Sequence, residues 1–476
     1  MKEKIYDVWL ISKRELRDQM RDWRILAPLL ILTIGFPFLM DAFAYATVNF
    51  VNQYGGTLLV DRLIPFSVLI IGFFPLTISL LGALESFVGE KERGTIEPLL
   101  GSPLADWQLY LGKLIVGIVM PLVSSFTSIT IYLVMVSRQD LNMPEATVFA
   151  QLFLLTIAHA LLMVSAAILF SISSTSVKAA NLLASFIIIP VAMLMMGESF
   201  LLFWANNEVL WLAVLAVTIM AGLLVRLGLA HFQREYLLGR EIDMLNLRWM
   251  WKTFWGYFKG EATSLREWFS VTLRIALGKL ARPMFALLLI GLSSAVIGYL
   301  WAANALPKTY TIEERTEKVE QLRQRLADNN LESFSKTISA PTLFAHNVRS
   351  TLVIAFMGIF SFGVLGVIFY ILNIGIVGVL LGMFKMIGYS PWPLLLAGIA
   401  PHGIFEIPAL MLSCAAVMHI GLILVTPQTR KTVGEVLIEG IADWTKITLG
   451  VVVPLLAVAA MIEVYVTPQL LSQFVK

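Results

Sequence analysis

Charged side chains are scarce in this chain of 476 residues, of which Asp, Glu, Lys and Arg make up only 14%. An average soluble domain carries about 25%, and the hydrophobic fraction here is 58%. Apolar runs of about 18 residues or more match a hydrocarbon layer about 30 Å thick. Because lipid offers the backbone no hydrogen bonds, and runs of this length favour helices over barrel strands, we predict an all-α polytopic membrane protein.

Cysteine is almost absent, and so are the motifs of common catalytic sites. Cys414 is the only cysteine, which excludes an intramolecular disulfide and a cysteine-based metal cluster. The Gly-Lys pairs at 112–113 and 278–279 lack the upstream glycine and the following Ser or Thr of a P-loop. No nucleophile, carboxylate dyad or cofactor motif stands out, and nothing indicates nucleic acid. We therefore expect no catalytic residues, no metal and no cofactor in this chain.

The first part of the chain predicts an interfacial helix followed by six spans. Residues 2–24 hold seven basic and five acidic side chains with apolar residues at near-helical spacing, which is typical of a helix lying in the membrane interface. A solvated charged helix is the alternative. Spans are expected near residues 25–46, 63–88, 107–136, 148–172, 182–203 and 209–229. With the N-terminus in the cytoplasm, residues 1–230 form the first domain with both ends inside.

The composition changes at residues 231–282, where nine basic residues and four tryptophans are interleaved. This pattern predicts a cytoplasmic linker that lies on the inner membrane interface. A second membrane domain, 283–476, follows, with an outer loop at 304–349 in which Thr311–Glu314 fits a capping box. The apolar runs after Ser350 are interrupted at Asn373–Gly375 and at Pro401–Gly403, so we expect broken or re-entrant helices and ten to eleven transmembrane helices overall.

A charged turn lies between the second and third predicted spans. Its acids and bases are too costly to face lipid, so the turn is expected to dock on a soluble surface. The pattern Glu90-x-Glu92-Arg93-Gly94-Thr95-x-Glu97-x-Leu99-Leu100-x-x-Pro103, with Gly112-Lys113 after it, resembles the permease subunits of the ABC-2 exporter family. An ordinary charged inner loop is the alternative.

This resemblance implies a coupling helix that meets a separate ATPase subunit, which would bind ATP and Mg²⁺. It also implies a homodimer of this chain with two ATPase subunits. The residues that the resemblance places at or beside the ATPase are Glu90, Glu92, Arg93, Gly94, Thr95, Glu97 and Pro103.

A second constellation is Pro401-His402-Gly403-Ile404-Phe405-Glu406, in which helical geometry places His402 and Glu406 on one face. With polar and glycine residues upstream, it resembles the stage II sporulation protein M (SpoIIM, DUF95) family over residues 275–470. The implied signature positions are Asn347, Asn373, Gly375, His402, Gly403 and Glu406. The pair either binds a proton or ion, or is a hydrogen-bonded structural pair. A zinc site is not favoured, because His346, His402, His419 and Glu406 have no close-spaced ligand motif.

Other polar residues in the predicted spans are weaker signals. Glu85, Glu198 and Glu463 are expected to reach water near span ends. Asp41 and His159 are the candidates for lining a substrate path, since ionisable groups deep in a membrane are usually functional.

The composition predicts a multi-pass protein of the cell membrane. The two resemblances imply that it serves as the permease of an ATP-driven exporter, with a SpoIIM-like half that gates or specifies the path. One rival hypothesis is a cell-envelope scaffold regulated by an ABC ATPase. Another is an ion- or proton-coupled carrier that uses His402 and Glu406.

Overall fold

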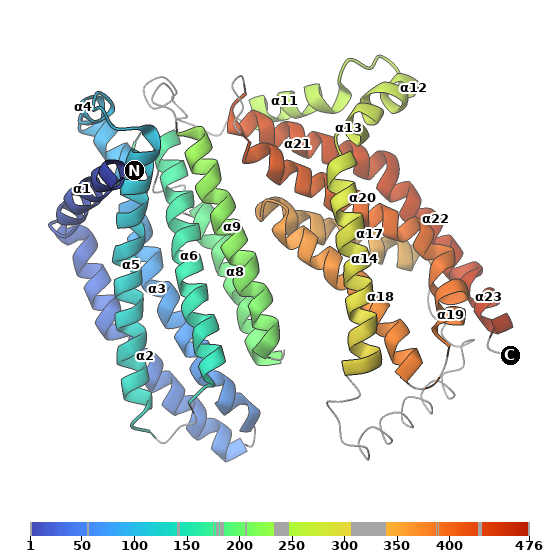
Figure 1. Cartoon of the computed structure of the whole chain (residues 1–476), viewed down its shortest axis with the longest axis horizontal. Helices are drawn as coiled ribbons and strands as arrows, with labels where there is room; N and C mark the ends of the chain where they lie inside the picture. The colour runs from blue at the N-terminus through green and yellow to red at the C-terminus, as the bar shows by residue number, and fades with distance from the viewer. Residues whose placement is uncertain are drawn as a thin grey trace. The chain divides into compact units, whose positions relative to one another are not determined.

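The computed structural model describes the chain except residues 1, 55–56, 140–142, 175, 178–179, 181–184, 205–206, 233–246, 306–338, 387, 389, 427–430 and 475–476. The secondary structure of the described residues is helical (Figure 1), and ten of their helices are long and apolar enough to cross a membrane. A shorter apolar helix spans Ile187–Phe203. The prediction of an all-α polytopic membrane protein is confirmed.

The chain divides into two compact units: unit 1 comprises Met1–Leu245 with Val425–Pro427, and unit 2 comprises Asn246–Leu424 with Gln428–Lys476. The helices of unit 1 are α1 (Lys2–Gln19), α2 (Trp23–Tyr54), α3 (Thr57–Glu92), α4 (Ile96–Leu100), α5 (Asp106–Val136), α6 (Ala146–Ser173), α8 (Ser185–Trp204), the 3₁₀-helix η1 (Asn207–Val209) and α9 (Leu210–His231).

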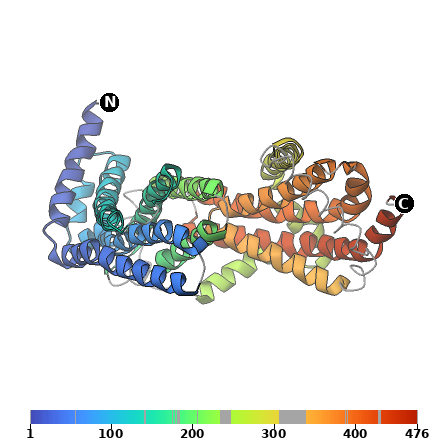
Figure 2. The same ribbon diagram turned by 90° about the horizontal axis from the view of Figure 1, so that it is seen from below.

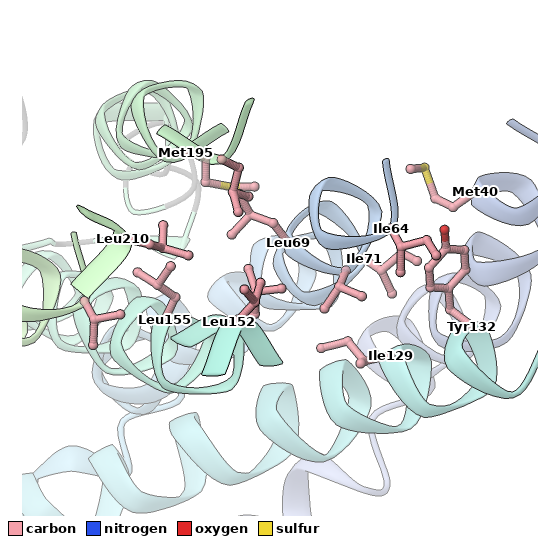
Figure 3. Close-up of a cluster of buried hydrophobic side chains, with 14 of the residues drawn as sticks. Met40, Ile64, Leu69, Ile71, Ile129, Tyr132, Leu152, Leu155, Met195 and Leu210 are labelled. Atoms are coloured by element: carbon pink, nitrogen blue, oxygen red, sulfur yellow. The ribbon is translucent and has the colours of Figure 1, made fainter. Parts of the chain in front are cut away.

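Unit 1 is held together by side chains that α2, α3, α5, α6, α8 and α9 contribute to one cluster (Figure 3). Ile71, Ile129 and Leu152 are fully buried in it. Small polar residues let the helices approach, as where Ser125 Oγ donates to the carbonyl oxygen of Gly72 at 2.7 Å. Close packing and such hydrogen bonds, rather than escape from water, hold helices together in lipid.

Helix α1 packs along α5, beside the other helices of unit 1 (Figure 2). It turns polar side chains toward α5, where Ser12 Oγ donates to the carbonyl oxygen of Gly112 at 3.0 Å. Its aromatic residues Tyr6 and Trp9 are exposed. The docked face also holds the apolar Val8, and the exposed side combines aromatic residues with Lys13 and Arg14, a mixture that suits a helix lying in the membrane interface.

The helices of unit 2 begin with α11 (Leu247–Lys259), α12 (Leu265–Glu267), the π-helix η2 (Trp268–Leu273), α13 (Arg274–Gly278), α14 (Ala281–Leu300), the π-helix η3 (Trp301–Ala305), α17 (Ala340–Phe360) and α18 (Val364–Met386). They continue with α19 (Pro391–Pro393), the π-helix η5 (Leu394–Ile399), α20 (Ala400–Leu424), α21 (Val433–Ile447), the π-helix η6 (Thr448–Val452), α22 (Val453–Tyr465) and α23 (Thr467–Phe474).

Of the interruptions expected in unit 2, the one at Asn373–Gly375 is absent, because α18 runs through these residues. Next to Pro401 the helical geometry does change: the π-helix η5 ends at Ile399, α20 begins at Ala400, and α20 then continues past Pro408. The chain turns instead between α17 and α18, where Phe362 and Gly363 adopt positive φ angles of 54° and 94°. Glycine is tolerated inside apolar helices that pack on neighbours, so Gly375 marked a helix contact rather than a break.

Close backbone contact between α14 and α18 explains the glycines of that stretch. A Cβ atom on Gly298 would lie 2.5 Å from the carbonyl oxygen of Gly375, and one on Gly378 would clash with the carbonyl oxygen of Ala295. Ser294 Oγ donates to the carbonyl oxygen of Ile371 at 2.7 Å across the same contact. Small residues spaced by one helical turn allow this approach.

The predicted linker and outer loop are only partly described. Residues 233–246 and 306–338 lie outside the described part, and with them the expected helix that begins at Thr311. The end of the expected loop is helical, because α17 begins at Ala340. The tryptophan-rich helix α11 packs on α21 within unit 2, where Lys446 Nζ donates to the carbonyl oxygen of Tyr257 at 3.1 Å.

Candidate functional site

The charged turn after α3 is a tight helix ending. The Thr95 amide donates to the carbonyl oxygen of Glu90 at 2.9 Å, and the Gly94 amide donates to that of Lys91 at 3.2 Å. These two bonds form a Schellman motif, which needs a left-handed residue, and Gly94 has φ 68°. The short helix α4 follows at once and lies with α1 at one end of unit 1 (Figure 1).

Glu90 points into the unit rather than toward a partner. Its Oε1 lies 3.1 Å from Nζ of Lys113 on α5, and Oε1 of Glu15 on α1 lies 3.0 Å from the same nitrogen. Lys113 also donates to the carbonyl oxygen of Ser86 at 2.7 Å, and its side chain is 1% exposed. One buried cation therefore joins α1, α3 and α5 directly below the turn.

Two further residues of the turn bind the end of α6 and the segment that follows it. Lys91 Nζ donates to the carbonyl oxygen of Ile172 at 2.6 Å, so it satisfies an unpaired carbonyl of the last helical turn. Glu92 Oε1 accepts a hydrogen bond from the Val177 amide at 2.8 Å. The turn is thus fastened to α6 as well as to α1 and α5.

The remaining predicted coupling residues face outward. Arg93, Thr95 and Glu97 are exposed, whereas Ile96 between them is 5% exposed and anchors the start of α4. Pro103 is also exposed. Of the seven predicted coupling residues, Glu90 is thus directed into the unit and Glu92 is exposed while it binds the Val177 amide. The other five are exposed, and Arg93 and Glu97 give them their charge. This division was not visible in the sequence.

A second polar site lies in unit 2, where three side chains converge. His402 and Glu406 of α20 and Glu463 of α22 each place a nitrogen or oxygen atom within 4.8 Å of the others. The shared face that helical spacing predicted for His402 and Glu406 is therefore present. Glu463 was expected near a span end, and nothing in its local sequence points to α20.

Two protein-family models match the chain, one in each half. The model described as ABC-2 type transporter matches residues 6–197, and the model described as stage II sporulation protein M matches residues 284–468. Each model covers less than half of the chain, so the matches show that these two regions are similar to the two families. The predicted resemblances are confirmed: the first matched region lies within unit 1, and the second lies in unit 2 apart from Val425–Pro427.

Two curated relatives are similar to parts of the chain. Uncharacterized protein MJ0793 of Methanocaldococcus jannaschii is 31% identical over 148 residues, which is 31% of this chain and 82% of that protein. The probable ABC transporter permease protein NosY of Pseudomonas aeruginosa is 35% identical over 106 residues, which is 22% of this chain and 37% of NosY. No solved structure matches the chain.

The other SpoIIM-like signature positions lie on three helices, α17, α18 and α20. Asn347 lies on α17 with its Nδ2 buried and without a hydrogen-bond partner among the described residues. Asn373 is exposed on α18 and donates to the carbonyl oxygen of Phe369 at 2.8 Å. Gly375 serves the contact with α14, and Gly403 is buried on α20. Some of these positions therefore maintain helix packing.

The two predicted path residues lie in different surroundings in the ABC-2 unit. His159 Nε2 lies 3.3 Å from Glu198 Oε1, although the contact lacks hydrogen-bond geometry. Glu198 is 3% exposed, so the expectation that it reaches water was wrong: α8 turns it toward α6. Asp41 Oδ1 instead accepts a hydrogen bond of 2.8 Å from Gln139, just beyond the end of α5.

Proposed function

We propose that this chain is the membrane-spanning subunit of an ATP-driven ABC-2 exporter, powered by a separate ATPase that holds ATP and Mg²⁺. The observation that carries the proposal is the turn at residues 90–97. Glu90 binds Lys113 of α5, which also binds Glu15 of α1, and Lys91 binds the end of α6, while Arg93 and Glu97 are exposed on the same turn. A contact that transmits force needs both features: side chains bonded to the membrane helices, and exposed charged side chains that a partner can bind.

The connections of the turn suggest how a push on it would reach the membrane helices. A displacement of α4 would move the end of α3, because the two helices are joined by the Schellman motif. The Glu90–Lys113 contact would pass the same displacement from α3 to α5. Lys91 would transmit it to α6. Because Lys113 is buried, its ion pairs are screened less than surface pairs and resist separation. The helices would therefore tilt together when the ATPase closes.

The complex is proposed to contain two copies of this chain and two ATPase subunits, in the cell membrane with the N-terminus in the cytoplasm. Supporting this orientation, α1 and the turn carry basic side chains such as Arg14, Arg17 and Arg93, and exposed aromatic residues of α1 would lie in the lipid interface. The SpoIIM domain is proposed to gate or specify the path.

The test is ATPase stimulation in lipid nanodiscs. The chain is co-expressed with P-loop ATPases encoded beside it, co-purified, and compared with Arg93→Glu. Reversal of an exposed charge at the contact should lower stimulation at least tenfold, because like charges then oppose each other across the interface. Arg138→Glu is the matched control, since Arg138 is exposed just after α5 ends.

The outcomes separate the rival functions. Stimulation lost with Arg93→Glu and kept with Arg138→Glu supports the exporter. Failure to recover any ATPase overturns it. Activity in proteoliposomes without an ATPase would favour an ion- or proton-coupled carrier. ATPase stimulation together with a bound cell-wall enzyme, and with no transported molecule, would favour the envelope scaffold.

A further inference from the structure

His402, Glu406 and Glu463 form a compact group that the transport proposal does not use. The three come from two helices, α20 and α22, that are far apart in sequence and pack side by side. All three side chains are partly buried. Each can offer one lone pair to the same point, because the offered atoms lie within 4.8 Å of one another.

His402 is held in a fixed orientation by a neighbour on α23. Its Nδ1 lies 3.2 Å from Oγ1 of Thr467, which is 8% exposed. When the Nδ1–H donates to this hydroxyl, the lone pair of Nε2 is left for another ligand. A hydrogen bond to the second ring nitrogen is the usual companion of a metal-binding histidine, since it sets the tautomer and the ring direction.

The two carboxylates of the group make no ion pair with a lysine or arginine in the described part of the chain, and the basic groups near Glu406 are the imidazoles of His402 and His346. The ion pairs found there involve other acids, and Glu406 and Glu463 take part in none of them. Two carboxylates this close repel each other unless a proton or a cation lies between them. The imidazole beside them makes a cation the better match, because it adds a third donor directed at the same point.

We propose that His402, Glu406 and Glu463 bind a divalent transition-metal ion, with Zn²⁺ as the best-fitting ion. One imidazole nitrogen with two carboxylate oxygens is a ligand set that zinc accepts, whereas Ca²⁺ and Mg²⁺ prefer oxygen alone. Three protein ligands leave a fourth position open for water. The site is independent of the ATPase contact in unit 1.

Only a small adjustment is needed to close the site around an ion. Ligand atoms about 2.1 Å from a tetrahedral Zn²⁺ are about 3.4 Å apart, so the three atoms must approach by at most about 1.4 Å from their present spacing. Rotation of the two flexible glutamate side chains supplies this. The bound ion would join α20 to α22 at the end of unit 2 where α19 and α23 lie (Figure 1).

The test measures metal on the purified full-length chain in detergent. The protein is stripped with a chelator, loaded with Zn²⁺ and washed, and the metal content is read by mass spectrometry and the affinity by calorimetry. We expect one Zn²⁺ per chain, and at least a tenfold loss of affinity in Glu463→Gln and in His402→Gln. His419→Gln is the matched control, because His419 lies on α20 outside the group.

A second measurement does not depend on the variants folding. X-ray absorption at the zinc edge of the wild-type protein should show low-Z oxygen and nitrogen ligands with a single imidazole. Several imidazoles or sulfur ligands would overturn the proposal. So would a wild-type chain that retains no ion, or variants that bind Zn²⁺ as tightly as wild type. In either of the last two cases, a shared proton would be what stabilises the paired carboxylates.

Discussion

Lys113 Nζ on α5 lies 3.1 Å from Glu90 Oε1 on α3, inside the unit and beneath the exposed turn. Glu90 was expected at the ATPase interface, but through this contact it joins α3 to α5 inside unit 1. Glu15 of α1 binds the same nitrogen of Lys113. The positions of α1 and of the turn after α3 therefore both depend on the charge of Lys113.

Removing that cation should destabilise unit 1 strongly. Lys113→Met leaves Glu15 and Glu90 facing each other without compensation, and we expect the free energy of unfolding to fall by about 3 kcal/mol. The measurement is the thermal unfolding midpoint in detergent. Lys252→Met, at an exposed lysine of α11, is the control and should have little effect. Because the loss comes from uncompensated charge, adding Glu15→Gln and Glu90→Gln to Lys113→Met should recover most of it.

Gly94→Ala should weaken coupling to the ATPase without filling any space. A Cβ atom at Gly94 meets nothing within 4 Å, but φ is 68°, where an L-residue is strained. The strain is about 1–2 kcal/mol, and it should loosen the turn. We expect lower ATPase stimulation with normal expression. Gly197→Ala, in an open helical site of α8, should leave stimulation unchanged. Equal effects of the two variants would contradict a role of the left-handed turn.

The contact of α14 with α18 predicts intolerance of even one methyl group. Gly378→Ala would place a Cβ atom against the backbone oxygen of Ala295, which cannot rotate away. Overpacking of this kind costs about 1–3 kcal/mol, and the unfolding midpoint of unit 2 should fall accordingly. Gly256→Ala on α11 meets open space and is the control. An unchanged midpoint for Gly378→Ala would show that the two helices are not this close.

Alkaline pH should remove the contribution of Lys279 to stability. Burial alone would lower the pKa of Lys279, but its hydrogen bonds and ion pairs with Asp443 and Glu439 raise the pKa above 10.5. The folded state therefore holds this proton more tightly than the unfolded state. The stability it contributes is fully present below about pH 10.4, the unfolded value, and is lost as pH rises through the folded pKa.

The measurement for Lys279 is the difference in unfolding midpoint between wild type and Lys279→Met across neutral to strongly alkaline buffers. We expect a constant difference up to the ordinary lysine pKa and a decline above it. A difference that already disappears near neutral pH would contradict the assignment. Lys252→Met should show no such pH-dependent difference, since Lys252 is an exposed lysine of the same unit.

Hydropathy was enough to predict the class of fold and most spans, because lipid requires long apolar helices whatever their neighbours are. The turn at Glu90–Thr95 was also readable, since its charges cannot face lipid and Gly94 permits a left-handed ending. The break at Asn373–Gly375 was predicted wrongly, because Gly375 marks a close contact with α14 rather than an interruption, and only the neighbouring helix distinguishes the two. Near Pro401 the expected irregularity takes the form of a π-helix that ends at Ile399.

What pattern alone could establish is local: the apolar spans, the exposed charged turn and the shared face of His402 and Glu406. What needed the tertiary structure is every partnership between distant segments. Lys113 selects Glu90 and Glu15, His159 meets Glu198, and Glu463 reaches the pair on α20 only when α22 packs beside it. Helical periodicity determines which side of a helix a residue occupies, but packing determines which helix that side faces.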